Sequence, residues 1–149
     1  MLDGLLQVLE FDVSVDFRGA QVAVAEELLQ VHRSYLTVLR GLIPSGAIYG
    51  MAHITGGGFT DNIPRVLPAG IGVRIDRTAW QVPTIFRLIQ ERGHVDEMEM
   101  YRVFNMGIGI VLLVSPEQVE QALAILQGEA VVIGQAVPWD ESAPRVKIF

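Results

Sequence analysis

The stretch Gly107-Ile-Gly-Ile-Val-Leu-Leu-Val114 carries no polar side chain, and it lies between two segments with helical character. A short run of this kind predicts a fully apolar β-strand near the centre of a sheet. Glycine leaves space beside the backbone, so Gly107 and Gly109 indicate that another part of the chain approaches closely where the strand begins. The fold is therefore expected to be organised around residues 107–114.

Helices are predicted on both sides of this strand in the sequence. Residues 83–92 begin with a proline, which is favoured in the first helical turn. Residues 96–104 begin with an aspartate that is able to act as the N-cap. Residues 115–126 begin with Ser-Pro-Glu, a serine cap with proline at the first helical position. These starts predict three separate helices.

Further strands are predicted from short apolar or alternating runs at residues 48–54, 70–75, 130–137 and 145–149. Residues 5–15 combine a helix-like first half with an alternating second half, so their type stays open. Strands and helices do not alternate strictly along the chain. We therefore expect an α+β domain with one mixed sheet and helices packed on both of its faces.

The longest predicted helix spans residues 22–42. Its apolar residues recur at intervals of three and four, which places them on one helical face: Val24, Leu28, Val31, Tyr35, Val38 and Leu42. The helix should end near Gly41, because Pro-Ser-Gly at positions 44–46 continues a helix poorly.

Length, charge and composition exclude several classes of function. The chain has 149 residues, 50% of them hydrophobic, and a formal net charge of -6. This suits one compact domain, and the negative charge would repel a nucleic acid. The absence of cysteine excludes thiol catalysis and thiolate metal sites. No apolar run reaches the roughly 18 residues that cross a membrane, and the N-terminus does not resemble a signal peptide, so we expect a cytoplasmic protein without a membrane partner.

The segment His53-Ile-Thr-Gly-Gly-Gly-Phe59 is the principal candidate for chemistry. Gly56, Gly57 and Gly58 allow consecutive amides to turn toward one point, where a phosphate or another anion would bind. A short helix over residues 62–67, with Thr60 or Asp61 as its N-cap, would add its positive end. The motif lacks the Lys-Ser/Thr ending of a P-loop and the spacing of a dinucleotide fingerprint. A plain tight turn is the alternative.

Three other side chains near these segments are candidates, each with a structural alternative. His53 is able to bond a ligand oxygen or accept a proton, or it is a buried histidine satisfied by the backbone. Arg33 suits a phosphate, or an exposed salt bridge. Asn105 is able to donate to a ligand, or it ends a helix for conformational reasons. Asp61 and Asn62 are interpreted as structural.

Metal binding is not predicted from these residues. His32, His53 and His94 lie 21 and 41 residues apart, without the i, i+4 spacing of a helical zinc pair. The acidic residues Asp96, Glu97 and Glu99 are interpreted as favourable charges in the first turn of a helix rather than magnesium ligands.

Several motifs taken together resemble the C-terminal domain of aminoimidazole ribonucleotide synthetase, also called phosphoribosylformylglycinamidine cyclo-ligase. The resemblance runs from about Glu26 to the end of the chain. It is carried by residues 53–59, Asp61-Asn-Ile-Pro-Arg-Val-Leu-Pro68, Pro83-Thr-Ile-Phe-Arg-Leu-Ile89, Glu99-Met-Tyr-Arg-Val-Phe-Asn-Met-Gly-Ile-Gly109 and Val132-Ile-Gly-Gln135.

The resemblance implies ATP- and magnesium-dependent closure of formylglycinamidine ribonucleotide to aminoimidazole ribonucleotide in purine biosynthesis. It implies a phosphorylated ribonucleotide as substrate, contacted by Arg33, Thr55, the three glycines of residues 56–58 and Asn105. It also implies a catalytic role for His53, whose position is often aspartate near magnesium and phosphate in related proteins. In the family an N-terminal domain holds most of the ATP and magnesium site and the dimer contacts, so a homo-oligomer is expected.

The resemblance divides the chain into a loosely matching segment, residues 1–22, and a synthetase-like domain, residues 23–149. The family's N-terminal ATP-binding domain is expected to be absent, so the chain would be catalytically incomplete alone, with a separate N-terminal-domain chain as a possible partner. One departure is Thr37, which stands where the family commonly has lysine. Losing a cation there would weaken phosphate binding. The alternatives are a non-enzymatic binding or assembly module, or a divergent remnant of the family; a complete enzyme in one short chain is a third possibility.

Overall fold

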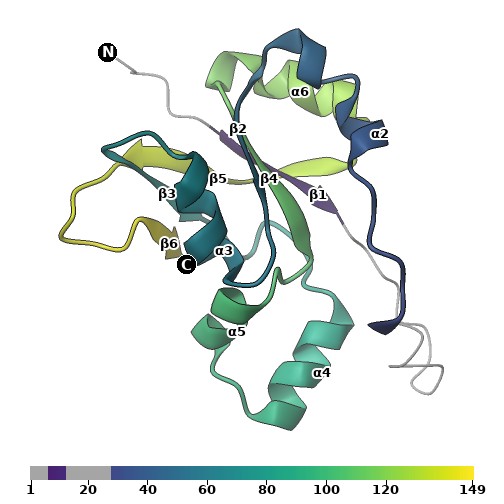
Figure 1. Ribbon diagram of the computed structural model, residues 1–149, viewed down its shortest axis with the longest axis vertical. Helices are drawn as coiled ribbons and strands as arrows, with labels where there is room; N and C mark the ends of the chain where they lie inside the picture. Colours follow the sequence, from purple (N-terminus) through teal and green to yellow (C-terminus); the bar gives the residue numbers. More distant parts are fainter. Residues whose placement is uncertain (1–6, 13–27) are drawn as a thin grey trace.

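The computed structural model describes residues 7–12 and 28–149, and it contains one six-stranded sheet with strand order β2-β4-β1-β5-β3-β6 (Figure 1). The strands are β1 (Gln7–Asp12), β2 (Ile48–His53), β3 (Ile71–Ile75), β4 (Ile108–Val114), β5 (Ala130–Pro138) and β6 (Val146–Ile148). Neighbouring strands are antiparallel except for β3 and β6, which are parallel. The predicted mixed sheet is thereby confirmed.

The helices of the described residues lie in two groups (Figure 1). One group contains α2 (Leu36–Leu39), which is followed by the short 3-10 helix η1 (Ile43–Ser45). It also contains α6 (Val119–Leu126), which is preceded by the short 3-10 helix η3 (Pro116–Gln118). The other contains α3 (Gly58–Asn62), η2 (Ile63–Val66), α4 (Thr84–Gly93) and α5 (Glu97–Val103).

Strand β4 separates the two groups and forms the centre of the core. All seven of its residues are buried. Ile110, Leu112 and Val114 pack with Leu39 of α2 and with Ala122 and Leu126 of α6. Val111 and Leu113 belong to the cluster that contains Phe59 of α3 and Met100 and Tyr101 of α5. Successive side chains of a strand point to opposite faces, so helices cover both faces of the sheet, as predicted.

The glycines at the start of β4 are sites of close approach, as their spacing predicts. A Cβ atom on Gly109 would lie 1.6 Å from the hydroxyl oxygen of Tyr35. A Cβ atom on Gly107 would lie 2.5 Å from the ring of Pro83, and Gly107 also has a φ of +98°. Tyr35 therefore packs directly against the backbone of the central strand.

The prediction of a long helix over residues 22–42 is wrong for residues 30–35, which are neither helix nor strand. Residues 22–27 lie outside the described residues. The predicted apolar face is buried only in part: Leu28 is 63% and Val31 is 95% exposed, whereas Tyr35 and Leu42 are buried. Residues 31–37 include β-branched, serine and histidine residues of modest helix propensity. Burial of Tyr35 against Gly109 outweighs that weak preference, and within residues 30–42 the α-helix is limited to the four-residue α2.

Most of the other predicted elements are confirmed. β2, β3, β5 and β6 occupy the four predicted strand regions, α4 and α5 the first two predicted helices, and β1 settles the open segment as a strand. The carboxylate of Asp96 accepts hydrogen bonds from the amides of Met98 and Glu99, at 2.9 and 3.4 Å, as an N-cap should. Ser115 differs: its hydroxyl bonds the side chain of Gln118 instead of capping the helix.

None of the helices in the described residues is both long enough and apolar enough to cross a membrane.

Candidate functional site

A glycine turn, residues Thr55–Gly58, connects the end of β2 to the start of α3. The amide of Ile54 donates to the carbonyl oxygen of Gly109 at 2.9 Å, which ties the turn to the start of β4. The amide of Gly58 donates to the carbonyl oxygen of Thr55 at 3.0 Å and closes the turn. Gly57 and Gly58 have φ angles of +93° and +56°, a region that favours glycine.

The three glycines have different steric roles. A Cβ atom on Gly58 would lie 2.0 Å from the carbonyl oxygen of Tyr101, and one on Gly57 would lie 2.5 Å from the carboxylate of Asp61. A Cβ atom on Gly56 would meet nothing within 4 Å. Packing therefore requires glycine at positions 57 and 58, whereas position 56 is open to the surface.

The helix after the turn begins earlier than predicted. α3 starts at Gly58 with Gly57 at its N-cap, so Thr60 and Asp61 lie inside the helix and do not cap it. Thr60 instead donates from its hydroxyl to the carbonyl oxygen of Gly57, at 3.2 Å. The positive φ angles of the two glycines allow this early start. A helix of five residues has only a small dipole, so the amides of the turn itself are the relevant donors.

Asn62 determines the orientation of the turn, and its side chain is 4% exposed. Its Nδ2 donates to the carbonyl oxygens of Gly58, Thr55 and Gly56, at 2.8, 3.2 and 3.4 Å. No peptide bond of the described residues is cis, and in a trans peptide the C=O and N–H groups point in opposite directions. The amides of Gly56 and Gly57 must therefore point away from Asn62.

Those two amides are available to a ligand. Within the described part of the chain, no hydrogen bond uses the N–H of Gly56 or of Gly57, and Gly56 is exposed. Two neighbouring amides directed outward are able to donate to one anionic oxygen. The interpretation of Asn62 as structural is correct, but the sequence did not indicate that it orients the turn.

Phe59 directly follows the turn and packs in an aromatic cluster with Trp80 and Tyr101. The ring of Phe59 lies 5.9 Å from the rings of Trp80 and of Tyr101, measured between centroids. The indole N–H of Trp80 donates to the carbonyl oxygen of Met106 at 3.0 Å. Burial raises the pKa of the Tyr101 phenol above its ordinary value, and the Glu97 carboxylate raises it further.

The raised pKa of Tyr101 predicts a loss of stability at alkaline pH. The folded protein keeps the phenolic proton to a higher pH than the unfolded chain, whose tyrosine pKa is about 10. The unfolded state therefore binds fewer protons above that pH, and the free energy of unfolding falls as pH rises. Urea unfolding at pH 8 and pH 10.5 should show a smaller decrease for Tyr101→Phe than for the wild type. Equal decreases would contradict the assignment to Tyr101.

His53 lies immediately before the turn and is exposed rather than buried. Its Nε2 atom is 3.2 Å from Nε2 of His32, and the two rings are stacked with centroids 5.3 Å apart. Tyr35 presents its ring edge-on to both histidines. The predicted alternative of a buried histidine is wrong. The histidine pair was missed because 21 residues separate its members and the predicted helix would have held them apart.

Arg33 and Asn105 both have partners within the chain. Arg33 forms an ion pair with Glu129, the structural alternative predicted for it. The side-chain oxygen of Asn105 accepts a hydrogen bond from the amide of Gly107 at 3.1 Å, between α5 and β4. These two interactions do not show whether a substrate also contacts Arg33 or Asn105.

The acidic residues at the start of α5 play the helix-start role predicted for them. Asp96 caps the helix, Glu97 pairs with Arg77, and Glu99 accepts a hydrogen bond from Arg102 at 2.6 Å. The Arg102 guanidinium holds the pKa of Glu99 below its ordinary value. The described residues contain no group of three or more histidine, aspartate or glutamate side chains placed to hold a metal ion.

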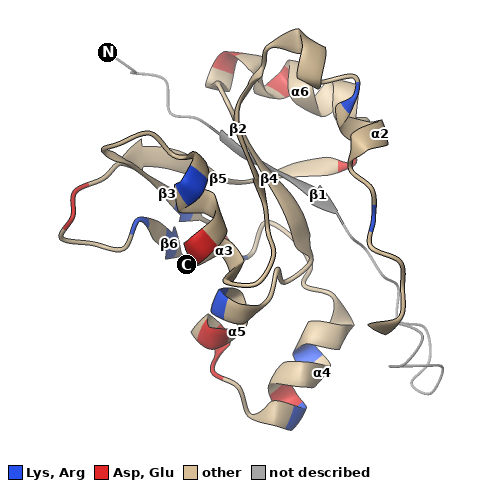
Figure 2. Cartoon of the chain, in the orientation of Figure 1, with Lys and Arg blue, Asp and Glu red and all other residues tan. Residues whose placement is uncertain are grey.

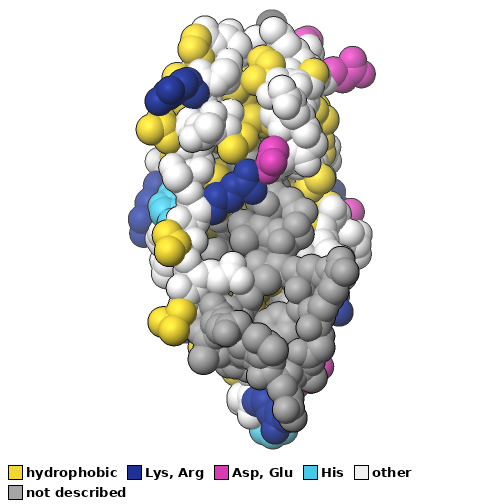
Figure 3. Space-filling model, turned by 90° about the vertical axis from the view of Figure 1, so that its right-hand side faces the viewer, with side chains coloured by type: hydrophobic (Ala, Val, Ile, Leu, Met, Phe, Trp, Pro, Cys, Tyr) yellow, Lys and Arg dark blue, Asp and Glu magenta, His cyan; other side chains and the backbone are white. Residues whose placement is uncertain are grey.

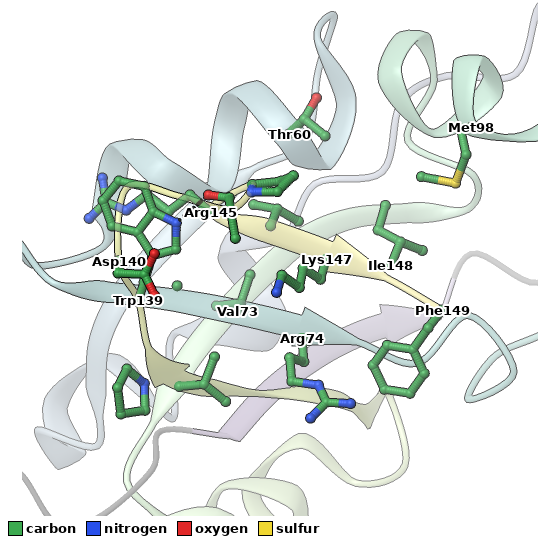
Figure 4. A pocket seen from close by; sticks show the side chains of 16 residues that line it. Thr60, Val73, Arg74, Met98, Trp139, Asp140, Arg145, Lys147, Ile148 and Phe149 are labelled. Atoms are coloured by element: carbon green, nitrogen blue, oxygen red, sulfur yellow. Dashed lines mark hydrogen bonds between the residues drawn. The ribbon is translucent and has the colours of Figure 1, made fainter.

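A groove of about 840 Å³ lies elsewhere, along β6 and the adjacent β3 (Figure 4). Arg74, Lys147, Trp139 and Phe149 line it, together with Arg145. The Arg145 guanidinium is occupied by backbone carbonyl oxygens, among them those of Ile71 and Leu67, at 2.9 and 3.0 Å. None of the predicted site residues lines this groove.

Charged residues are dispersed over the described elements, with acidic and basic positions interspersed on α4 and α5 and a single acidic position on α3 (Figure 2). The turn itself contains no charged residue. Its affinity for an anion would therefore come from backbone amides.

The model of the family "AIR synthase related protein, C-terminal domain" matches residues 5–147. Phosphoribosylformylglycinamidine cyclo-ligase from Geotalea daltonii is 42% identical over 147 residues, which are 97% of this chain and 42% of the relative. The enzyme of the same name from Desulfitobacterium hafniense is 55% identical over 97 residues, which are 65% of this chain and 29% of the relative. The chain spans less than half the length of these curated relatives.

Solved structures of similar fold include the Escherichia coli hydrogenase maturation protein HypE, with a TM-score of 0.61 and 21% identity over 97% of this chain and 45% of HypE. A second HypE structure has a TM-score of 0.65 and 19% identity over 97% of this chain and 49% of that one. These likenesses concern the fold alone. The family match over residues 5–147 and the identities of 42% to 55% lead to one conclusion: this chain belongs to the C-terminal domain family of the AIR synthase related proteins.

Proposed function

We propose that this chain provides the C-terminal half of a phosphoribosylformylglycinamidine cyclo-ligase, and that the glycine turn binds a phosphate group of its ligands. The observation that carries the proposal is the pair of amides at Gly56 and Gly57, directed outward because Asn62 holds the carbonyl oxygens of the turn. The proposal agrees with the names of relatives at 42% to 55% identity. The substrate would be a phosphorylated ribonucleotide.

The chemistry follows from what amide donors do for a phosphate. In the proposed reaction, ATP phosphorylates the amide oxygen of formylglycinamidine ribonucleotide, and attack by the substrate nitrogen closes the ring and expels phosphate. Phosphoryl transfer depends on positioning and on stabilising charge at the phosphate oxygens. Fixed amides do this without reorganising. Gly56 and Gly57 would hold the phosphate, while His53 would bond a ligand oxygen or accept a proton.

Arg33, Thr55 and Asn105 are proposed as further substrate contacts. Thr55 is exposed at the start of the turn, and its hydroxyl lies 3.5 Å from Oδ1 of Asn62. Arg33 and Asn105 would contact the ligand in addition to their present partners, which are Glu129 for Arg33 and the amide of Gly107 for Asn105. The division into residues 1–22 and 23–149 likewise stays a prediction.

The described residues suit a phosphate better than they suit magnesium. Mg²⁺ prefers carboxylate and water oxygens, and the described part of the chain contains no group of three or more acidic or histidine side chains placed to hold a metal ion. We therefore assign no step through Mg²⁺ to this chain. ATP and magnesium would be bound mostly by the family's N-terminal domain, so turnover should require that domain.

Calorimetric titration with formylglycinamidine ribonucleotide, with and without magnesium-ATP, tests the proposal. Gly56→Asp and Gly56→Asn form a matched pair, because position 56 is sterically open and the two side chains differ only in charge. The aspartate carboxylate would repel the phosphate, so we expect Gly56→Asp to bind at least about tenfold more weakly than Gly56→Asn. Absence of binding by the wild type, or equal affinity of the two variants, would refute the role of the turn.

A second candidate function is assembly without catalysis, and exposed apolar side chains favour it. Leu28, Leu29, Val31 and Leu36 are 60% or more exposed on the segment leading into α2. Figure 3 shows hydrophobic side chains distributed over the face to which this segment belongs. Exposed apolar surface of this kind marks interaction sites. Light scattering should then detect self-association that ATP does not change, whereas a monomer at all concentrations would argue against it.

A further inference from the structure

We propose that His32 and His53 together bind one divalent transition-metal ion of the zinc and nickel class through their Nε2 atoms. The two residues come from different parts of the chain. His53 ends β2, and His32 lies in the irregular segment before α2. The fold therefore creates this pair, and no local spacing in the sequence encodes it. The proposal does not rest on phosphate binding by the glycine turn, although both proposals use His53.

The separation of the two nitrogen atoms suits a shared ion. Their Nε2 atoms are 3.2 Å apart. Two imidazole ligands at about 2.0–2.1 Å from a tetrahedral zinc ion would place their nitrogen atoms about 3.3 Å from each other. In the protein without metal, one imidazole N–H donates to the other ring, so a single proton occupies the space between them. A metal ion would take the place of that proton after a small rotation of each ring, and the donating ring would carry its proton on Nδ1 instead, so that both imidazoles stay neutral.

The surroundings hold the pair in place while leaving it accessible. The backbone of His53 is fixed by pairing with Ile110 of β4. His32 is positioned by its neighbours: the buried ring of Tyr35 lies 5.8 Å from its ring, and Arg33 is tied to Glu129. Both histidine side chains are exposed, so an ion is able to reach them from solvent. Ligands that are already close together lose less entropy when they bind.

The donor set determines the class of metal. Neutral imidazole nitrogen suits zinc, nickel and copper, whereas magnesium and calcium prefer oxygen ligands. In the described residues no third histidine or carboxylate joins the pair. Water would complete the coordination, which implies modest affinity and ready release. The ion would link the segment around residue 32 to the end of β2, directly before the glycine turn.

Calorimetric titration of the untagged chain with nickel chloride and with zinc chloride tests this proposal, with no ribonucleotide present. We expect one ion per chain. His94 is the third histidine and is exposed in a left-handed conformation at the end of α4, which asparagine tolerates. His32→Asn, His53→Asn and His94→Asn are therefore matched variants. The first two should each weaken binding at least tenfold, and the third should leave it unchanged.

Thermal unfolding gives a second readout. A ligand that binds only the folded protein raises its melting temperature, so nickel should stabilise the wild type and His94→Asn and should not stabilise the other two variants. Magnesium chloride should have no such effect on any of them. Binding that survives in the His32→Asn/His53→Asn double variant, or that is lost equally in His94→Asn, would overturn the assignment. Failure of ribonucleotide binding would leave this result unaffected.

Discussion

Replacing Gly58 by alanine is expected to lower the free energy of unfolding by about 3 kcal/mol or more. Two costs combine at this position. The φ of +56° is unfavourable for any residue with a Cβ atom, and that atom would lie 2.0 Å from the carbonyl oxygen of Tyr101. The obstacle is backbone of α5, so it is relieved only by moving α3 away from α5. The glycine turn would be displaced with it.

Urea unfolding of alanine variants at two further glycines separates the conformational cost from the steric cost. Gly46 has a φ of +72°, and a Cβ atom there would have nothing within 4 Å, so Gly46→Ala reports the conformational cost alone, about 1 kcal/mol. Gly56 has open space and no positive φ, so Gly56→Ala should change stability little. The expected order of destabilisation is Gly58, then Gly46, then Gly56. A Gly58→Ala variant no less stable than Gly46→Ala would show that α3 and α5 are not packed as described.

Replacing Asn62 by aspartate should destabilise the protein by about 2 to 4 kcal/mol and disorder the turn. The two side chains have the same shape, but the aspartate places an oxygen acceptor where Nδ2 now donates to three carbonyl oxygens. The new carboxylate would be buried without a donor at that position. The cost therefore arises from electrostatics and lost hydrogen bonds, not from a cavity.

Urea unfolding measures this loss, and amide hydrogen exchange locates it. Exchange should accelerate at Gly58, whose amide closes the turn, and remain unchanged in β4. Thr55→Val is the matched control, because the Thr55 hydroxyl is 3.5 Å from Asn62 and its bond is weak. It should cost less than about 1 kcal/mol. If Asn62→Asp were no more destabilising than Thr55→Val, Asn62 would not be what orients the turn.

The position of the glycine turn was predictable, but the roles of its residues were not. Three successive glycines after an apolar strand indicate a turn whatever the rest of the chain does. Which of them must be glycine depends on Tyr101 and Asp61, and the outward direction of two amides depends on the buried side chain of Asn62. The predicted caps Thr60 and Asp61 failed because glycine, with its wider range of φ, starts the helix earlier.

The sequence by itself determined the elements whose physical cause is local. β4 follows from an apolar run, α5 from the Asp96 cap, and α4 from the proline at its start, because hydrophobic pattern and capping act within a few residues. The motifs of residues 53–109 also carried the family resemblance that the comparisons confirm.

Only the tertiary structure decided what residues 30–35 do. Their helical periodicity was real, but a helix would have kept Tyr35 from packing against Gly109. The irregular segment brings His32 to His53 and Arg33 to Glu129, across 21 and 96 residues of sequence. Contacts between distant segments depend on how the whole sheet and its two cores assemble, and packing against a buried strand outweighs a helix propensity of roughly a few tenths of a kcal/mol per residue.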